Sequence, residues 1–249
     1  MTLFIDIGNS RSKFWLVVAG KLVDSFSDSN AQAALMWLQQ QEANIKRVII
    51  ASVRTKEATE QLLQSLLLMR HEVVFVSYNE ALLCSEYENT CQLGIDRWLA
   101  ALAAKNIRQA AQPVIIVDAG TAITLDVLSA DGNHLGGYIL PGLSMQVAAL
   151  GQHTDKVQVG KPEWSDVRIG QNTQDCVSHG ILATVISLIR HVKSDMEQEA
   201  PVTLYLTGGD AKVLIPFIPE AIYVQELVLL GLMSATKFPL IQGLVQCEV

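Results

Sequence analysis

Two short turns of the form Asp-x-Gly constrain the fold of this chain more than any other feature. The first is Asp6-Ile7-Gly8-Asn9-Ser10, which follows the apolar residues 3–5, and the second is Asp118-Ala119-Gly120-Thr121, which follows Val114–Val117. A second strand-like segment comes after each turn, so each turn predicts a β-hairpin. The two turns lie about half of the 249-residue chain apart. They therefore predict a duplicated domain with a cleft between the two copies.

The elements expected after the two turns follow roughly the same order, which also indicates an internal duplication. Each half begins with three strands, and helices and further strands follow. The expected strands are 3–5, 12–18, 21–26, 48–51, 73–76, 114–117, 123–128, 134–139 and 202–206. The expected helices are 30–42, 55–70, 96–111, 143–150, 172–196, 210–214 and 227–237. We place the domain boundary close to the helix 96–111, with domains 1–112 and 113–249.

Composition excludes several classes of protein. Half of the residues are hydrophobic and 17% are charged, which favours a packed core over disorder. The net charge of −7, without a cluster of Lys and Arg, disfavours a nucleic-acid partner. The longest apolar stretch, near 181–189, is far shorter than the ~20 residues of a membrane span, and Asp6 interrupts the only apolar run that could begin a secretory signal. The four cysteines form no C-x-x-C pair and are expected to be reduced thiols of a cytoplasmic protein.

The first turn has the residue types that a phosphate site needs. Gly8 allows the backbone N–H groups to approach a phosphate closely, Asn9 and Ser10 can donate hydrogen bonds, and Lys13 supplies positive charge. Asp6, at the end of the strand, can hold a hydrated Mg²⁺. An ordinary strand turn with a capping Asp would have the same residues. The second turn, with Asp118, Gly120 and Thr121, favours the functional interpretation, because two such turns could hold a triphosphate from both sides.

Two further motifs could belong to the same site. Thr207-Gly208-Gly209 lies between an expected strand and a short helix, where paired glycines would let a nucleotide base or ribose lie against the backbone. Gly94-Ile95-Asp96-Arg97 opens the helix 96–111. The free N–H groups and the dipole of a helix N-terminus favour the ionised carboxylate of Asp96, which could then accept a proton from an alcohol. Arg97 could pair with an anionic group, although a capping Asp beside a solvated Arg remains the alternative.

Other catalytic patterns are missing from the sequence. The five histidines show no metal-ligand spacing, so we interpret them as surface or structural residues. The chain contains neither a G-x-S-x-G elbow nor a Walker A loop, so nothing supports a serine hydrolase or a P-loop enzyme.

The assembled motifs resemble those of the type III pantothenate kinases, a family within the actin-like, acetate-and-sugar-kinase and Hsp70 ATPase superfamily. The resemblance extends over essentially the whole chain. Its matching segments are D-I-G-N-S-R-S-K at 6–13, Y-E-N-T-C-Q-L-G-I-D-R at 87–97, D-A-G-T-A-I-T-L-D at 118–126, G-G-Y-I-L-P-G-L at 136–143, G-Q-N-T at 170–173 and T-G-G-D-A at 207–211. The family usually has Thr where this chain has Ser10. The hydroxyl is kept, so only the rigidity of that turn is affected.

The resemblance implies an α/β fold of two ribonuclease H-like domains, each a mixed five-stranded sheet with flanking helices. It implies transfer of a phosphoryl group from ATP to pantothenate, the first step of coenzyme A synthesis, with Mg²⁺ and a monovalent cation, K⁺ or NH₄⁺. It makes Asp96 the general base and Asp118 the ligand of the monovalent cation. The implied ATP-binding residues are Asp6, Ile7, Gly8, Asn9, Ser10, Arg11, Ser12, Lys13 and Thr121. The implied pantothenate-binding residues are Tyr87, Gly94, Ile95, Asp96, Arg97 and Thr173.

The resemblance also implies a homodimer that binds pantothenate near the subunit interface, where Thr173 could come from the partner subunit. Two alternatives to the kinase remain open. One is a superfamily kinase for another small alcohol or acid, which Tyr87 and the G-x-D-R motif disfavour. The other is a non-enzymatic regulator that keeps the fold, which the presence of Asp6, Asp96, Asp118 and Thr121 disfavours.

Overall fold

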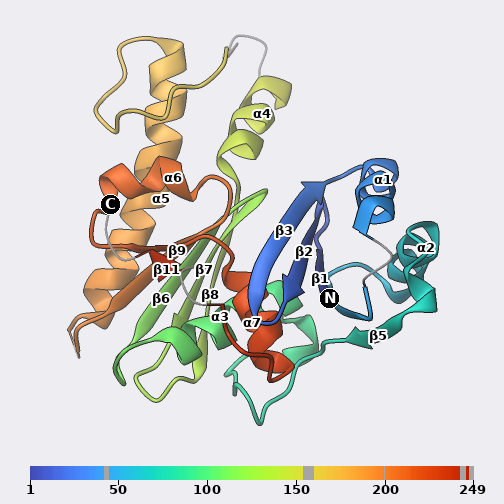
Figure 1. The fold of residues 1–249 in the computed structure, drawn as a ribbon. Helices are drawn as coiled ribbons and strands as arrows, with labels where there is room; N and C mark the ends of the chain where they lie inside the picture. Colours follow the sequence, from blue (N-terminus) through green and yellow to red (C-terminus); the bar gives the residue numbers. More distant parts are fainter. Residues whose placement is uncertain (42–44, 154–159, 199, 242–244, 247–249) are drawn as a thin grey trace. The chain divides into compact units, whose positions relative to one another are not determined.

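The computed structural model of this chain describes residues 1–41, 45–153, 160–198, 200–241 and 245–246. These residues form two compact units (Figure 1). The first unit contains Met1–Ile107 and the later segment 226–241, and the second contains Arg108–Gln225 and the strand Val245–Gln246.

The first unit is a five-stranded mixed sheet with helices on both faces. Its strand order is β3-β2-β1-β4-β5; β1 and β3 are antiparallel to β2, whereas β4 runs parallel to β1 and β5. The strands are β1 (Thr2–Ile7), β2 (Ser12–Val18), β3 (Lys21–Asp28), β4 (Arg47–Ser52) and β5 (Glu72–Phe75). The helices are α1 (Ala31–Gln41), α2 (Lys56–Ser65), α3 (Ile95–Ile107) and α7 (Leu227–Ala235), with 3₁₀ turns at Leu68–Arg70 and Thr90–Gln92.

Alternation along the strands of the first unit supplies both faces of its sheet with apolar side chains. Leu3 and Ile5 of β1 belong to a core that includes Leu38 of α1 and Leu63 of α2. Phe4, between them in the strand, points to the opposite face, and its ring lies 5.4 Å from that of Phe238 in an edge-to-face contact. The central strands β1 and β4 are therefore buried on both faces, as expected where strands pair in parallel.

Helix α7 belongs to the first unit because it packs closely against α3. Residues 227–233 are all buried, and a Cβ atom at Gly231 would collide with the backbone carbonyl of Leu99 in α3. The expected division between residues 112 and 113 differs from these units. The first unit ends where α3 ends, at Ile107, and the chain later returns to it through α7. The units differ from the expected domains because α7 is apolar on every side, and it is buried against α3 and the first sheet.

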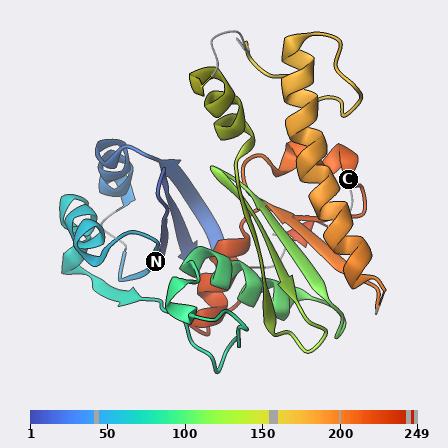
Figure 2. The ribbon, with the colours of Figure 1, turned by 180° about the vertical axis from the view of Figure 1, so that it is seen from behind.

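The second unit contains a six-stranded sheet in the order β11-β10-β9-β6-β7-β8. Its strands are β6 (Val114–Ala119), β7 (Ala122–Leu128), β8 (His134–Pro141), β9 (Thr203–Thr207), β10 (Ile222–Val224) and β11 (Val245–Gln246). Its helices are α4 (Leu143–His153), α5 (Thr173–Met196) and α6 (Ala211–Leu214), with a 3₁₀ turn at Ile215–Phe217. The long helix α5 lies along one face of this sheet (Figure 2), where Leu182, Val185 and Ile189 join the core formed by β6, β7 and β9.

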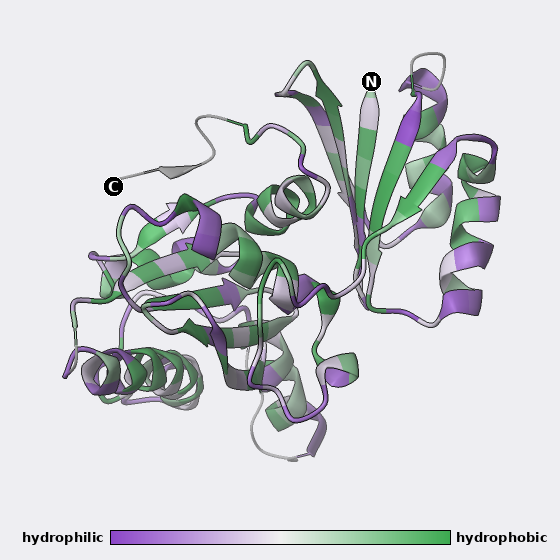
Figure 3. Ribbon diagram, turned by 90° about the horizontal axis from the view of Figure 1, so that it is seen from below, coloured by the Kyte–Doolittle hydropathy of each residue, from purple (hydrophilic) through white to green (hydrophobic). Residues whose placement is uncertain are grey.

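The two sheets share one topology, which confirms the predicted duplication. The order β8-β7-β6-β9-β10 in the second unit repeats β3-β2-β1-β4-β5 in the first, with the same antiparallel and parallel pairs. This is the ribonuclease H-like arrangement that was expected. The short strand β11 extends the second sheet from the expected five strands to six. Figure 3 shows hydrophobic residues concentrated in the strands of both sheets.

Most element boundaries agree with the prediction, and three helices end earlier; the helix expected over 227–237 ends at Ala235. The helix expected over 55–70 ends at Ser65, because Leu67 adopts a left-handed conformation (φ 57°) before the 3₁₀ turn. The helix expected to reach residue 111 ends at Ile107. The expected end of the first helix, at residue 42, lies outside the described residues, as does Cys247. Among the described helices, none is long and apolar enough to cross a membrane.

Candidate functional site

The β1–β2 turn of the first unit presents the residues expected to bind phosphates. Asp6 and Lys13 are direct cross-strand partners at the base of the hairpin. The N–H of Gly8 donates to the carbonyl of Arg11 at 3.1 Å and closes the turn. A Cβ atom at position 8 would lie 2.9 Å from that carbonyl oxygen, so glycine is required for this closure. The backbone of the turn is therefore held tightly even though its tip is exposed.

Burial separates the structural residues of this turn from the accessible ones. Asn9, Ser10 and Arg11 are exposed, whereas Ile7 and Ser12 are buried. Asp6 is 9% exposed and Lys13 is half-buried. An exposed tip with amide, hydroxyl and backbone N–H donors can bind an anion.

Arg54 also contacts this turn, although no motif in the sequence indicates it. Its Nε donates to the carbonyl of Gly8 at 2.8 Å, and its Nη2 donates to the carbonyl of Asn9 at 3.3 Å. Arg54 comes just after β4, which lies beside β1 and parallel to it. The carboxyl ends of neighbouring parallel strands meet at the same edge of a sheet, so the contact follows from the pairing of β1 with β4 and not from a pattern in the sequence.

The residues expected to bind and activate the second substrate gather at the N-terminus of α3. Asp96 lies in the first turn of this helix, one residue after its start, and its Oδ1 accepts from the N–H of Arg97 at 2.8 Å. A Cβ atom at Gly94 would lie 2.5 Å from the same Oδ1. The helix N-terminus and the neighbouring glycine therefore determine the position of this half-exposed carboxylate.

Arg97 and Tyr87 form a pair beside Asp96. Nη1 of Arg97 donates to the hydroxyl of Tyr87 at 3.1 Å, and its guanidinium carbon lies 5.6 Å from the centre of the tyrosine ring. Arg97 is 6% exposed, so most of this cation is enclosed by protein. The structure therefore brings together Tyr87, Gly94, Asp96 and Arg97, and their role in substrate binding stays a prediction.

In the second unit, Asp118 lies near the end of β6 and is half-buried. Its register partners are Thr124 of β7 and Thr207 of β9, and the residue after Thr207, Gly208, has φ 94°. A Cβ atom at Gly208 would collide with Oδ1 of Asp118 and with the carbonyl of Ala119. The predicted motif at 207–209 thus lies directly against the second Asp-x-Gly turn.

Thr121 occupies the exposed tip of the β6–β7 turn. The N–H of Gly120 donates to the carbonyl of Ala122, and the N–H of Gly142 donates to the carbonyl of Thr121, both at 3.0 Å. A Cβ atom at Gly142 would collide with the carbonyls of Gly120 and Thr121. The backbone that carries the Thr121 hydroxyl is thus held by these hydrogen bonds and by the close approach of Gly142.

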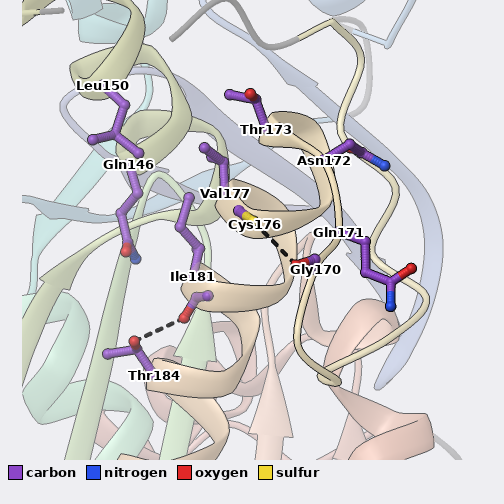
Figure 4. A pocket seen from close by; sticks show the side chains of 11 residues that line it. Gln146, Leu150, Gly170, Gln171, Asn172, Thr173, Cys176, Val177, Ile181 and Thr184 are labelled. Carbon is purple, nitrogen blue, oxygen red and sulfur yellow. Dashed lines mark hydrogen bonds between the residues drawn. The ribbon is translucent and has the colours of Figure 1, made fainter.

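Thr173 lines a separate hollow of the second unit, with a volume of about 770 Å³. It is the first residue of α5, after the capping residue Asn172, whose side chain accepts from the N–H of Asp175 at 3.0 Å. Figure 4 shows Gln146 and Leu150 on α4 facing Val177 and Ile181 on α5 across this hollow. Thr173 therefore lies at the exposed end of a partly apolar groove between two helices.

Acidic and histidine side chains do not form a metal cluster in the part of the chain that the structure describes. The buried His134 is structural, since its Nε2 lies 2.7 Å from Oδ1 of Asp126, and both side chains are almost completely enclosed. A divalent ion would accordingly need oxygen ligands from a bound phosphate as well as from the protein.

Comparison with known proteins identifies relatives over almost the whole chain. The family model described as type III pantothenate kinase matches residues 2–195. A type III pantothenate kinase from Acinetobacter baumannii (strain ACICU) is 35% identical over 241 residues, which cover 93% of this chain and 95% of that protein. Another, from Marinobacter nauticus, is 34% identical and covers 93% of this chain and 96% of that protein.

Solved structures agree with the fold. A crystal structure from Campylobacter jejuni, described as a conserved putative Baf family transcriptional activator, has a TM-score of 0.64 and 26% identity, and covers 94% of this chain and 97% of that one. A putative 2-dehydro-3-deoxygalactonokinase from Sinorhizobium meliloti has a TM-score of 0.58 at 13% identity and covers 95% and 98%. This chain belongs to the type III pantothenate kinase family.

Proposed function

We propose that this protein is a pantothenate kinase, which transfers the γ-phosphate of ATP to the primary hydroxyl of pantothenate and yields 4′-phosphopantothenate. The reaction is the first step of coenzyme A biosynthesis. The observation that carries the proposal is the position of Asp96 in the first turn of α3, beside the enclosed pair of Arg97 and Tyr87, in a chain of this family.

Phosphoryl transfer asks a protein mainly for positioning and for compensation of negative charge. In the proposed mechanism the residues from Asp6 to Lys13, together with Thr121, bind the phosphates of ATP. Asp96 accepts the proton of the attacking hydroxyl as its oxygen bonds to the γ-phosphorus and the bond to ADP breaks. Arg97, oriented by Tyr87, binds the carboxylate of pantothenate, and Gly94 and Ile95 complete this side of the site.

Two cations complete the proposal, and the donor groups described above are compatible with both. Asp118 is assigned to a monovalent cation, K⁺ or NH₄⁺, because its carboxylate lies beside the backbone carbonyl of Ala119 at the end of β6. Mg²⁺ is assigned to the ATP phosphates, with Asp6 as the nearby carboxylate, because Mg²⁺ in kinases is usually held by one or two carboxylates and the substrate phosphates. When bound, these ions neutralise the charge of the triphosphate.

Thr173 supports the proposal of a homodimer. The groove in which it lies is lined by apolar side chains that include Leu150, which is 37% exposed. A second copy of the chain that covered this groove would bury Leu150 and bring Thr173 close to a bound pantothenate. Sedimentation velocity at micromolar concentration should give a single dimeric species; a monomer at every concentration would contradict this part of the proposal.

The central experiment is an assay of ADP release with ATP, Mg²⁺ and pantothenate, with and without K⁺. We expect turnover that depends on pantothenate and increases with K⁺ or NH₄⁺. The absence of pantothenate-dependent turnover under all these conditions would refute the proposed function. The use of ATP is consistent with a cytoplasmic location.

The role of Asp96 has its own test. Asp96→Asn removes the proton acceptor and keeps the shape of the side chain, so kcat should fall by roughly 10²–10⁴-fold. Nucleotide binding, measured by calorimetry with ADP, should stay within about twofold of the wild type, which corresponds to a few tenths of a kcal/mol. Near-normal turnover in this variant would remove Asp96 from the role of base.

Two alternatives can be decided with the same preparation. A substrate panel in which another small alcohol or acid exceeds pantothenate in kcat/KM would favour a different superfamily kinase. The description of the Campylobacter jejuni structure as a transcriptional activator motivates a DNA-binding assay. DNA binding at physiological salt without kinase activity would favour a regulator, whereas the net charge of −7 argues against it.

A further inference from the structure

The side chain of Arg54 connects the end of β4 to the turn between β1 and β2. Its Nε donates to the carbonyl of Gly8 at 2.8 Å and its Nη2 to the carbonyl of Asn9 at 3.3 Å. The two donors belong to one planar guanidinium, whose fixed geometry suits two neighbouring acceptors. Arg54 is half-buried, whereas Asn9 and Ser10 are exposed.

The local backbone fixes the position of Arg54 itself. The N–H of Val53 donates to the carbonyl of Ile7 at 3.1 Å, which continues the parallel pairing of β1 and β4 beyond the last strand residue. The N–H of Arg54 donates to Oγ of Ser52 at 3.2 Å, and this hydroxyl lies 2.7 Å from Oγ1 of Thr59 in α2. The guanidinium therefore extends toward the turn from a rigid base.

These contacts determine which way two peptide groups of the turn face. In a planar trans peptide the C=O and N–H point in opposite directions. The carbonyl of Gly8 shares its peptide with the N–H of Asn9, and the carbonyl of Asn9 shares its peptide with the N–H of Ser10. When Arg54 holds both carbonyls, both N–H groups are directed away from Arg54. A row of N–H groups on one side of a turn is what an anion-binding backbone requires.

We propose that Arg54 is a positioning residue for the nucleotide: it holds the carbonyls of Gly8 and Asn9 so that the N–H groups of Asn9 and Ser10 face the ATP phosphates. This inference rests on the proposed function only in taking the β1–β2 turn as the phosphate site. Arg54 acts through the backbone of the turn and needs no contact with ATP. Without it, the two peptides can rotate, and a carbonyl oxygen that faced the phosphates would repel them.

The test compares nucleotide binding in Arg54→Ala, Arg54→Lys and the control Arg47→Ala. Arg47 lies at the opposite end of β4 and pairs with Glu72 at 3.2 Å on the surface. We expect Arg54→Ala to weaken binding of Mg–ADP, measured by calorimetry, by about tenfold or more, because the two charge-assisted hydrogen bonds that orient the turn are lost. The control should stay within about twofold. The KM for pantothenate should not change in any of the three.

Arg54→Lys separates the positioning role from a simple positive charge. Lysine keeps the charge but lacks the planar fork, so binding of Mg–ADP should remain weaker than in the wild type at an unchanged unfolding temperature. Millimolar guanidinium, at a concentration that does not affect the control, should restore part of the binding of Arg54→Ala. If Arg54→Ala does not fold, the lysine variant alone decides the matter. Wild-type affinity in Arg54→Lys would overturn the inference.

The design also distinguishes this inference from the proposed function. Weaker Mg–ADP binding in both Arg54 variants, without pantothenate-dependent turnover in the wild type, would uphold the positioning role and refute the pantothenate kinase. Normal turnover in the wild type with unchanged Mg–ADP binding in both variants would support the pantothenate kinase and refute the positioning role of Arg54. A wild-type protein that binds no adenine nucleotide would overturn both.

Discussion

A Cβ atom at Gly94 would lie 2.5 Å from Oδ1 of Asp96, so the missing side chain at position 94 provides the space that this carboxylate occupies. The obstacle to a larger residue is the end of a side chain that can rotate. Gly94→Ala should therefore displace the carboxylate of Asp96 and leave the fold intact.

We predict that Gly94→Ala lowers kcat by roughly 10²-fold, because a displacement of about 1 Å can cost this much in a positioned catalytic group. The unfolding free energy should change by less than about 1 kcal/mol, since only one side chain moves. Steady-state kinetics and urea unfolding measure the two effects. In an Asp96→Asn background the same substitution should have little further effect on kcat; an additive loss would contradict the link between the two residues.

The hydrogen bond from Arg97 to the hydroxyl of Tyr87 leads to a second prediction. Tyr87→Phe removes this hydrogen bond from an enclosed guanidinium and should lower the free energy of unfolding by roughly 1.5–3 kcal/mol, the usual contribution of a hydrogen bond to a charged group. If Arg97 binds the carboxylate of pantothenate, the KM for pantothenate should rise by about tenfold or more. The KM for ATP is the internal control. A change in the KM for ATP alone would place Tyr87 on the nucleotide side.

The hairpins and the duplication could be predicted from the sequence, because their signals are local. The alternation on either side of Gly8 and Gly120 indicates strands, and the carboxylates at Asp6 and Asp118 mark equivalent places in two copies. The start of the helix near Asp96 and Arg97 could be predicted for the same reason, since the signal of a helix start lies within a few residues.

Long-range packing could not be predicted in the same way. Residues 227–233 are so uniformly apolar that the sequence indicates a buried helix without indicating its partner, which is α3. Strand β10 has three residues, too few for a visible alternation. Arg54 follows an unremarkable strand end, and its acceptors lie more than forty residues earlier in the chain, so only the pairing of β1 with β4 brings them together.

Gly208 permits a prediction about the monovalent cation. Its φ of 94° strains any other residue, and a Cβ atom there would collide with Oδ1 of Asp118. Gly208→Ala should displace Asp118 and increase the K⁺ concentration needed for half-maximal activity. Gly209→Ala is the matched control for stability, because a Cβ atom at Gly209 meets no atom within 4 Å. An unchanged response to K⁺ in folded Gly208→Ala would contradict the assignment of the cation to Asp118.

His71 makes the stability of the first unit depend on pH. Burial, and secondarily the positive charge of Arg70, lowers the pKa of His71 below the ordinary value of 6.5. Since the folded protein binds this proton less readily than the unfolded chain, stability is lost as the pH falls from about 6.5 through the lower pKa of the folded state. His71→Gln, which does not titrate, should remove this loss. Urea unfolding of the wild type and of His71→Gln between about pH 8 and pH 5 measures this loss. If the difference in unfolding free energy between the two proteins does not vary with pH, the prediction is wrong.

The close approach of α3 and α7 gives the last prediction. A Cβ atom at Gly231 would collide with the backbone carbonyl of Leu99, and a backbone atom cannot move aside as a side-chain end can. Gly231→Ala should therefore separate the two helices and lower the unfolding free energy by roughly 1–3 kcal/mol, the usual cost of overpacking.

A second helical glycine provides the control. Gly151 lies in α4, and a Cβ atom there meets nothing within 4 Å. Gly151→Ala should be neutral or stabilising by up to about 1 kcal/mol, because alanine favours the helix. If Gly231→Ala stabilised the protein as Gly151→Ala does, the contact with Leu99 would not limit the packing of α7. Since Asp96 lies in the first turn of the same helix α3, a destabilising Gly231→Ala should also lower kcat, whereas Gly151→Ala should not.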